Sequence, residues 1–395
     1  MLTTDAQRDA IRQTFLEEST RFRISSLLFS TLARACADDE DILELVTAAR
    51  PGQSRSVLLF CVVHYLLLKS PEARLAQYFA SLADQPKPAT EAFPVFKEYC
   101  LEHRAEIVEL LSWRTVNTNL AEKASCLVPA LRHIELLSEG PLTLLELCCS
   151  AGLNMMFDEY HYDYGVGGSV GVTNSPVRLK CKVLGGGRPP LDSMPRVSRR
   201  IGVDLIKVDL SDPLQHLWMQ AVLYPEWRVE RARLKAALAL RAQRDLQIVQ
   251  GDALEVTGPL LEELPGRVCI LMSYCRGHWS ANALTALHET LRRASRHRDI
   301  HRLDVDPPDS EPPQVARARL VRLAEAGISV LKKRSPFRMD HTWYANGEAR
   351  STLLGEGDIF GEWLDWHVAD ANPGCGRREI RWPDYGYADP TGCEA

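Results

Sequence analysis

This sequence lacks several patterns that mark well-defined classes of protein. Its 11 cysteines are scattered, without a C-x-x-C pair or a cysteine–histidine cluster at zinc-ligand spacing, which argues against a disulfide scaffold and a structural zinc site. No G-x-G-x-x-G follows the first expected strand and no G-x-x-x-x-G-K-[ST] occurs. These two absences disfavour a dinucleotide-binding domain and the phosphate-binding loop of kinases and NTPases. Internal repeats and low-complexity tracts are absent too.

The chain also lacks an excess of one charge and a long hydrophobic run. Lys and Arg number 47 against 52 Asp and Glu, a net charge of −5, so nothing attracts the chain to nucleic acid or to an anionic membrane surface. The longest strongly apolar run, residues 57–68, is too short to span a bilayer, and the N-terminus has no signal-peptide pattern. We therefore expect a cytoplasmic protein with reduced cysteines and with neither a membrane nor a nucleic-acid partner.

What is present first is a long helical region. Residues 1–138 are expected to form an all-α N-terminal domain, a lid or substrate domain, because apolar positions recur at helical spacing. Proline and glycine at Pro51-Gly52, Ser70-Pro71 and residues 85–88 separate the helices. The expected helices are residues 15–35, 42–49, 56–69, 73–82, 105–111 and 121–137.

From residue 139 to 370, short apolar runs alternate with helical segments, which predicts an α/β domain with a parallel sheet covered on both faces. The expected strands are residues 142–147, 200–205, 246–251, 268–272, 299–305, 328–334, 338–344 and 349–354. The expected helices are residues 153–159, 214–243, 259–264 and 282–295. Residues 160–199 are an insertion, expected as a hairpin, and residues 371–395 are expected to be a flexible tail.

Polar or small residues follow the ends of the first four strands, where a parallel sheet binds ligands. They are Glu146, Ser150, Ala151, Gly152 and Asn154 after the first strand, Asp204 after the second, Asp252 after the third and Ser273 after the fourth. Small residues let backbone N–H groups approach a ligand at a helix N-terminus. The two aspartates suit a ribose diol and an adenine amino group. The set predicts an adenosine ligand, although strand-end polarity and helix capping are the alternatives.

Three tyrosines alternate in the insertion, at Tyr160, Tyr162 and Tyr164. On a strand they share one face. They are either a packed aromatic face or a wall beside a cationic ligand, to which aromatic rings are attracted. On the second interpretation Tyr160 and Tyr162 are candidate catalytic residues.

The polar stretch from Arg114 to Asn119 interrupts the helical region. Asn117 and Asn119 either cap a helix or act in catalysis as part of a lid, with Arg114 pairing with a ligand carboxylate. Asp304 and Asp306 end the fifth strand and could bind a metal or act as a base. No histidine ligand motif accompanies them, so we expect no metal.

The ordered strand ends make the C-terminal region similar to class I S-adenosylmethionine (SAM)-dependent methyltransferases. That resemblance implies a Rossmann-like class I methyltransferase sheet, here with a helical N-terminal domain. It also implies SAM as cosubstrate or sole substrate, and a small-molecule partner.

A resemblance to a bacterial family, domain of unknown function 2332, covers nearly the whole chain. It is carried by residues 114–119, 144–164, 200–209, 224–228, 250–252 and 361–366. The family favours Gln at Asn117, Glu at Leu120, Gly at Cys148 and His at Phe360. The resemblance implies a methyltransferase-like core without a settled reaction.

Three functions remain open. The first is methyl transfer to a small acceptor, leaving S-adenosylhomocysteine. The second, from natural-product biosynthesis, is cyclisation of SAM to azetidine-2-carboxylate with release of methylthioadenosine. The third is a non-catalytic SAM-binding module, favoured by Cys148 in the ligand loop.

Overall fold

The computed structural model describes residues 5–308, 313–328 and 336–368. The chain divides into two compact units. Unit 1 comprises Met1–Leu120, Val208–Gln243 and Ile328–Arg334, and unit 2 comprises Ala121–Lys207, Arg244–Gly327 and Ser335–Ala395. The expected boundary between the domains was residue 138, whereas unit 2 begins at Ala121. The helix expected at residues 121–137 therefore belongs to unit 2. A helical segment that follows the second strand belongs to unit 1.

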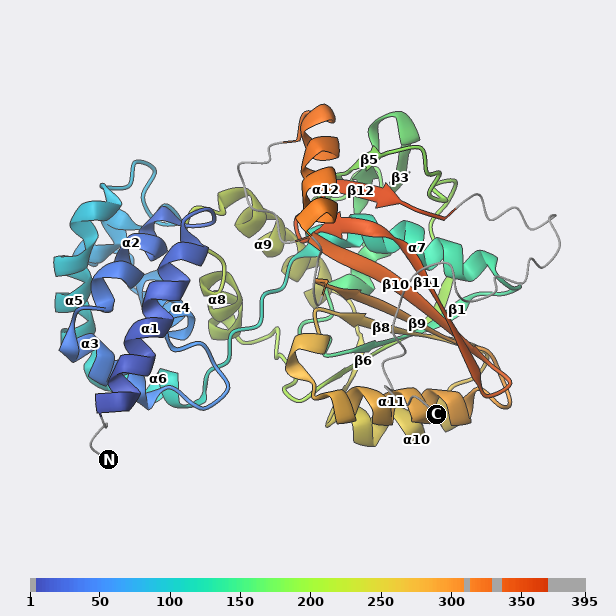
Figure 1. The fold of residues 1–395 in the computed structure, drawn as a ribbon, viewed down its shortest axis with the longest axis horizontal. Helices are drawn as coiled ribbons and strands as arrows, with labels where there is room; N and C mark the ends of the chain where they lie inside the picture. Colours follow the sequence, from blue (N-terminus) through green and yellow to red (C-terminus); the bar gives the residue numbers. More distant parts are fainter. Residues whose placement is uncertain (1–4, 309–312, 329–335, 369–395) are drawn as a thin grey trace. The chain divides into compact units, whose positions relative to one another are not determined.

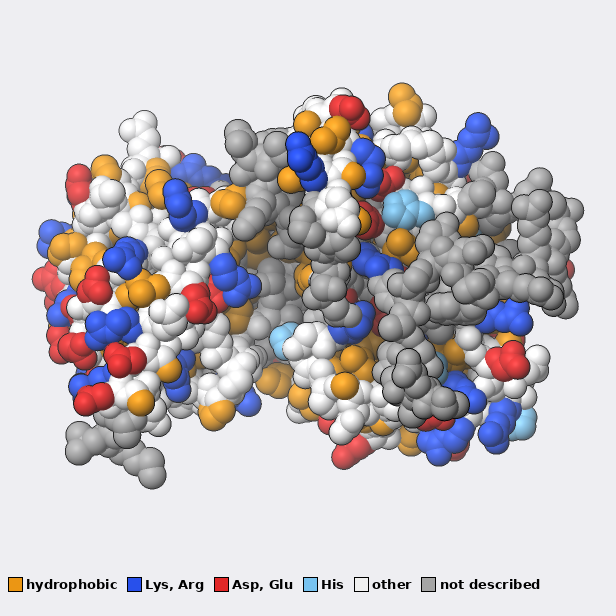
Figure 2. Space-filling model, viewed as in Figure 1, with side chains coloured by type: hydrophobic (Ala, Val, Ile, Leu, Met, Phe, Trp, Pro, Cys, Tyr) orange, Lys and Arg blue, Asp and Glu red, His pale blue; other side chains and the backbone are white. Residues whose placement is uncertain are grey.

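Unit 1 is helical (Figure 1). Its helices are α1 (Asp5–Phe22), α2 (Leu27–Cys36), α3 (Glu40–Leu45), α4 (Arg55–Lys69), α5 (Ala92–Glu102), α6 (Arg104–Trp113), α8 (Pro213–Ala221) and α9 (Arg228–Ala242). Short 3₁₀ turns are η1 (Val46–Ala48), η2 (Arg74–Tyr78) and η3 (Ala89–Glu91). Phe22, Phe29 and Phe60 pack ring against ring in the core. On the face drawn in Figure 2, acidic and basic side chains are interspersed over the α1–α5 helices.

Two long helices expected from periodicity are each a pair of helices. The expected helix 15–35 breaks before Ser26, whose side chain accepts a hydrogen bond from the Phe29 N–H and starts α2. The expected helix 214–243 ends after α8 and restarts at α9, on either side of Pro225. Pro225 cannot continue a helix, and Ser26 caps a new one. Apolar periodicity reports neither effect, so it did not reveal the breaks.

Unit 2 is a mixed α/β structure built on a large, mostly parallel sheet. Its nine strands lie in the order β5-β12-β11-β10-β9-β8-β1-β6-β7. Their bounds are β1 (Leu142–Leu147), β5 (Lys182–Leu184), β6 (Val197–Asp204), β7 (Gln247–Gln250), β8 (Arg267–Ser273), β9 (Ile300–Asp306), β10 (Pro336–Ala345), β11 (Glu348–Asp358) and β12 (Trp363–Trp366). The five strands β7, β6, β1, β8 and β9 run parallel, whereas β10, β11 and β12 pair antiparallel.

The central strands β1 and β8 are mostly apolar because both of their faces are covered. Every residue of β1 is buried. Alternate residues of β1, β6 and β8 form one core with Leu261 of α10 (Ala253–Glu263) and Leu287 and Leu291 of α11 (Ala281–Ala294). Figure 1 shows α10 and α11 together on one side of the sheet and α7 (Ala124–Leu136) on the other. The helix α12 (Pro313–Glu325) precedes β10.

The insertion is more than the expected hairpin. Part of it forms a separate three-stranded sheet, in the order β3-β2-β4, from β2 (His161–Asp163), β3 (Ser169–Gly171) and β4 (Arg178–Lys180). The strand β5, also part of the insertion, does not belong to this small sheet. It pairs with β12 at the edge of the large sheet. Apart from Ile328, the strand expected at residues 328–334 lies outside the described residues, as does the tail expected to be flexible. Among the described residues no helix combines the length and hydrophobicity needed to cross a membrane.

Candidate functional site

The strand order reverses at β1, which lies between β6 and β8. In open parallel sheets, ligands bind beyond the carboxyl ends of the strands at such a reversal. Leu147 at the end of β1 pairs with Val203 of β6 and Met272 of β8. Asp204 and Ser273 therefore flank the segment that follows β1. The structure thus brings together residues that are distant in the sequence, at the edge of the sheet where a ligand was expected.

The loop that follows β1 has an uncommon backbone conformation. Cys148, Ser150 and Gly152 all have positive φ, at 56°, 50° and 74°. Residues other than glycine rarely adopt such a backbone conformation. Asp204 holds the loop, since its Oδ2 accepts a hydrogen bond from the Ser150 N–H at 2.8 Å and its Oδ1 one from the Ile206 N–H at 3.1 Å. Ser150 and Ala151 are buried, whereas Cys148 is partly exposed.

The helix expected after this loop is instead the six-residue 3₁₀ segment η5 (Asn154–Glu159). A short 3₁₀ segment has a much smaller aligned dipole than an α-helix. The expectation of an α-helix over residues 153–159 is therefore wrong, and a helix dipole gives no support for an anion site here. A ligand at this loop would instead contact backbone groups and side chains at the ends of the strands.

Glu146 and Asn154 form a buried polar pair beside this loop. The Glu146 side chain is 2 % exposed, and its Oε1 accepts a hydrogen bond of 2.7 Å from Asn154 Nδ2. Glu146 Oε2 and Asn154 Oδ1 are buried without a hydrogen-bond partner among the described residues. Burial raises the pKa of Glu146 to about 8. Since buried acceptors are nearly always satisfied in proteins, these two oxygens indicate a place for a ligand that donates hydrogen bonds.

A buried lysine that no sequence motif indicated completes the cluster. Lys123 ends η4 (Ala121–Lys123), and its Nζ donates to Ser273 Oγ at 2.9 Å and lies 4.8 Å from the Tyr274 ring centre. Burial lowers its pKa, while the charges of Glu146 and Asp306 act in the opposite direction. Nothing in the local sequence predicts this position, because it depends on η4 meeting the carboxyl end of β8.

Asp306 is the second carboxyl group near Lys123. Its Oδ1 accepts from the Arg276 N–H at 3.3 Å, and its Oδ2 is buried without a partner among the described residues. Burial, reinforced by the charge of Asp304, raises the pKa of Asp306 to about 7. Two buried carboxyl groups with pKa values near neutrality, beside a lysine, can exchange protons with a bound group. Among the described residues no cluster could hold a metal ion.

Asp252 is exposed and caps α10, since its Oδ1 accepts from the Leu254 N–H at 2.8 Å. This geometry matches the capping alternative and leaves the other oxygen for further contacts. Two apolar residues that sequence reasoning missed follow Asp204 directly, and they are strongly exposed, Leu205 at 66 % and Ile206 at 53 %. Their adjacency to a strand-end acid was the signal that could have identified them.

The three tyrosines are fully buried. Tyr160 Oη donates to the Leu153 carbonyl at 2.9 Å, Tyr162 Oη to Phe157 O at 2.6 Å and Tyr164 Oη to Ser125 O at 2.6 Å. Tyr160 lies just before β2 rather than in it. With no exposed surface and with each hydroxyl bonded to a backbone carbonyl, they match the packing alternative rather than a wall beside a ligand.

Tyr160→Phe is therefore expected to lower the free energy of unfolding by about 0.5–1.5 kcal/mol, since it removes the buried hydrogen bond from Tyr160 Oη to the Leu153 carbonyl, without changing ligand affinity. Thermal unfolding and calorimetry with SAM measure the two effects. Tyr164→Phe, which removes the hydrogen bond from a buried tyrosine to the Ser125 carbonyl, is the matched control and is expected to lower stability in the same way. A large loss of SAM affinity without a loss of stability would instead favour a catalytic role for Tyr160.

Arg114, Asn117 and Asn119 belong to unit 1. The Arg114 guanidinium lies 4.2 Å from the ring centre of Trp113 and 4.7 Å from that of Trp218, and burial lowers its pKa. Asn119 Nδ2 donates to the Asn117 carbonyl at 3.3 Å. Their role in a lid over the ligand stays a prediction.

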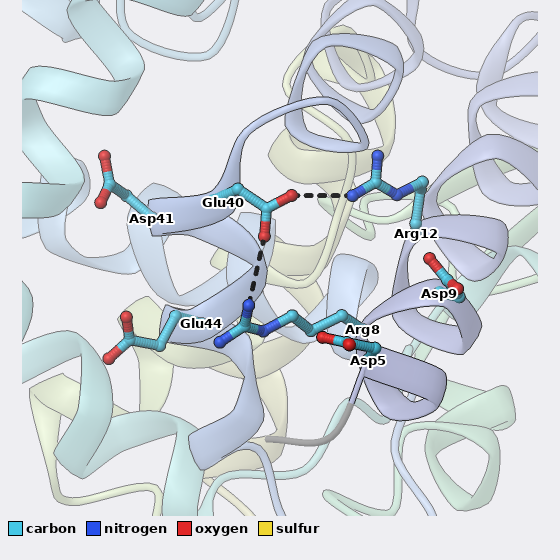
Figure 3. Close-up of a pocket in the computed structure, with 7 residues that line it drawn as sticks. All are labelled: Asp5, Arg8, Asp9, Arg12, Glu40, Asp41 and Glu44. Carbon is cyan, nitrogen blue, oxygen red and sulfur yellow. Dashed lines mark hydrogen bonds and ion pairs between the residues drawn. The ribbon is translucent and has the colours of Figure 1, made fainter. Parts of the chain in front are cut away.

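A hollow on the surface of unit 1 has a different character (Figure 3). Charged side chains line it, and Glu40 pairs with Arg12 at 2.8 Å and Arg8 at 3.9 Å. Exposed pairs of this kind contribute little to stability. None of the expected site residues lies there.

Comparison with known protein families matches residues 12–366 to the family described as "uncharacterized protein conserved in bacteria", DUF2332. Comparison with curated proteins gives no match. The family match includes most of both units and all of the strand-end residues described above. The chain therefore belongs to the bacterial DUF2332 family.

Proposed function

We propose that this chain is an enzyme that binds SAM at the carboxyl ends of β1, β6, β7 and β8 and transfers its methyl group to a small-molecule acceptor. On this proposal the large sheet is a Rossmann-like class I methyltransferase sheet. The observation that carries it is the unpartnered, buried Oε2 of Glu146, next to a loop that Asp204 closes. In chain order the five parallel strands lie 3-2-1-4-5, an order typical of nucleotide-binding α/β sheets.

The adenosine part of SAM suits the end of β6. Each carboxylate oxygen of Asp204 accepts one backbone hydrogen bond, Oδ2 from Ser150 and Oδ1 from Ile206. Each oxygen has a further lone pair, which a ribose hydroxyl can use. The exposed Leu205 and Ile206 offer apolar surface for the adenine ring. Asp252 keeps an oxygen for the adenine amino group.

The amino-acid part of SAM suits the buried cluster. Its ammonium group can donate to Asn154 Oδ1 and, once the Glu146 carboxyl releases the proton that burial holds on it, to Glu146 Oε2; both oxygens lack protein partners among the described residues. Lys123, 2.9 Å from Ser273 Oγ, supplies a positive charge for the ligand carboxylate. The proposal thus satisfies buried polar atoms that would otherwise destabilise the site.

Cyclisation of SAM is the second candidate, and the raised pKa values of Glu146 and Asp306 favour it. In this reaction the neutral α-amine attacks the γ-carbon, the bond from that carbon to sulfur breaks and methylthioadenosine leaves. The amine must first lose a proton, and a buried carboxylate with a pKa near neutrality can accept it. The products are azetidine-2-carboxylate, methylthioadenosine and the released proton.

One incubation distinguishes the candidates. The purified full-length chain is incubated with SAM alone and with SAM plus a bacterial small-molecule extract, and the products are identified by mass spectrometry. We expect S-adenosylhomocysteine only when the extract is added. Formation of both methylthioadenosine and azetidine-2-carboxylate from SAM alone would instead support cyclisation, whereas methylthioadenosine without azetidine-2-carboxylate would indicate lysis of SAM.

Calorimetry with SAM is the companion measurement. Binding without either product would support a non-catalytic SAM-binding module. Absence of measurable SAM binding by a folded sample would overturn all three functions, because each requires the adenosine site. A Tyr78→Phe variant, altered at a buried tyrosine of unit 1, is the control for effects of mutation and purification. It should bind SAM as the unaltered chain does.

A further inference from the structure

Two cysteines meet where the segments after β1 and β8 lie side by side. Cys148 follows β1 directly, and Cys275 is the second residue after β8. Cys275 Sγ lies 3.0 Å from the Leu147 carbonyl, the residue before Cys148. Cys148 packs against the apolar cluster that contains Cys275, so the two side chains lie in the same region, at the ends of the adjacent strands β1 and β8.

The two thiols differ in accessibility and in acidity. Cys148 is partly exposed, whereas Cys275 is fully buried. Hydrogen bonds from Cys275 and Trp279 lower the pKa of Cys148, so it is the thiol with more thiolate character. An accessible thiolate beside a second thiol is the arrangement typical of redox-sensitive cysteine pairs.

We propose that Cys148 and Cys275 form a reversible disulfide, with Cys148 as the thiol that reacts with oxidant and Cys275 as the resolving thiol. This proposal does not rest on the function proposed above. The oxidant is a peroxide. The bond joins the segments that follow two neighbouring strands at the candidate site.

The chemistry balances in two steps. The Cys148 thiolate attacks one peroxide oxygen, the O–O bond breaks, hydroxide leaves and a sulfenic acid forms. The Cys275 sulfur then attacks the sulfenic sulfur, an S–S bond forms, and the departing hydroxide takes the Cys275 proton as water. Overall the two thiols lose two electrons and two protons, and one hydrogen peroxide becomes two waters. A thiol such as dithiothreitol reverses the reaction.

Neighbouring cysteines provide matched controls. Cys149 is buried beside Cys148, and its pKa is raised chiefly by burial. Cys269 is buried within β8, and burial raises its pKa to about 12. Neither is expected to react. Cys149→Ser and Cys269→Ser therefore remove a thiol from the same peptide segments without removing either partner.

The test treats the reduced full-length chain with hydrogen peroxide and maps cross-linked peptides by mass spectrometry without reduction. We expect one peptide joining the segments of Cys148 and Cys275, lighter by two hydrogens and split by dithiothreitol. It should persist in Cys149→Ser and Cys269→Ser and disappear in Cys148→Ser and Cys275→Ala.

Cys148→Gly is a second test, because glycine tolerates the φ of 56° at this position. It should remain folded and form no cross-link. A cross-link that survives in Cys148→Ser, or oxidation of Cys148 to sulfinic acid without any cross-link in the unaltered chain, would overturn the proposal.

Discussion

Asp204→Ala is expected to weaken SAM binding by about a hundredfold or more and to lower the unfolding temperature. Asp204 accepts two backbone hydrogen bonds, from Ser150 at 2.8 Å and Ile206 at 3.1 Å. Hydrogen bonds to a charged group contribute about 1.5–3 kcal/mol each. The first holds a loop that contains two non-glycine residues with positive φ, so alanine frees the loop and removes the proposed ribose contact together. Calorimetry and thermal unfolding measure the two effects.

Asp212→Ala is the matched control for the loss of stability alone. Asp212 caps α8 in unit 1, where its Oδ1 accepts from the Leu214 N–H at 2.8 Å, so its removal is expected to cost about 1 kcal/mol without affecting SAM. Asp204→Asn keeps one carbonyl oxygen that can accept a hydrogen bond but removes the negative charge. It therefore distinguishes the contribution of the charge from that of the hydrogen bond. Unchanged SAM affinity in a folded Asp204→Ala chain would contradict the assignment of the ribose site.

Glu146→Gln is expected to weaken SAM binding by about tenfold to a hundredfold, yet to stabilise the ligand-free chain at alkaline pH. Glutamine keeps the shape and can still accept from Asn154, but it has no second acceptor for an ammonium group. Loss of a charged hydrogen bond accounts for the affinity, at about 1.5–3 kcal/mol. Calorimetry with SAM measures the loss.

The pH dependence follows from the raised pKa of Glu146. Burial moves it from 4.5 to about 8 in the folded chain, so the folded chain holds a proton that the unfolded chain releases above pH 4.5. The stability from this protonation is complete below pH 4.5 and is lost as the pH rises to about 8. Above pH 8 the unaltered chain carries a buried charge that Glu146→Gln lacks. We therefore expect the variant to be more stable there by about 1–3 kcal/mol.

Thermal unfolding at pH 5 and at pH 9 measures this difference. The variant and the unaltered chain should be similar at pH 5 and should diverge at pH 9. Glu289→Gln, an exposed glutamate paired with Arg292 on α11, is the control and should change little at either pH. A variant less stable than the unaltered chain at pH 9 would mean that the Glu146 charge stabilises the fold, and the proposed ammonium site would lose its support.

Much of unit 2 could be predicted from local pattern. The first strand is predicted with the bounds that it has, and four further parallel strands are placed within a few residues. Buried parallel strands are apolar along their whole length, so each is visible as a short apolar run. The carboxyl ends of parallel strands share one edge of the sheet, so Glu146, Asp204 and Ser273 could be gathered from sequence order alone.

Other elements could not be predicted, for identifiable reasons. The expected helix 15–35 is two helices because Ser26 bonds to the backbone and starts a new one, which apolar spacing does not detect. The insertion contributes β5 to the far edge of the large sheet, a pairing over a long sequence separation that no local pattern encodes. The alternating tyrosines left two interpretations open, because periodicity identifies a shared face but not what covers it.

By itself the sequence determined the alternation of strands and helices in unit 2, the helical character of unit 1 and the acids that end the strands. These follow from propensity, apolar spacing and chain order, which are local. Only the tertiary structure decided the chemistry of the site. The pKa values of Glu146 and Asp306, the position of Lys123 and the packing of Cys148 against the cluster that contains Cys275 depend on which groups exclude water and which lie near them. Desolvation and charge proximity are properties of folded neighbours, and Ser273, which accepts the hydrogen bond from Lys123, lies 150 residues further along the chain.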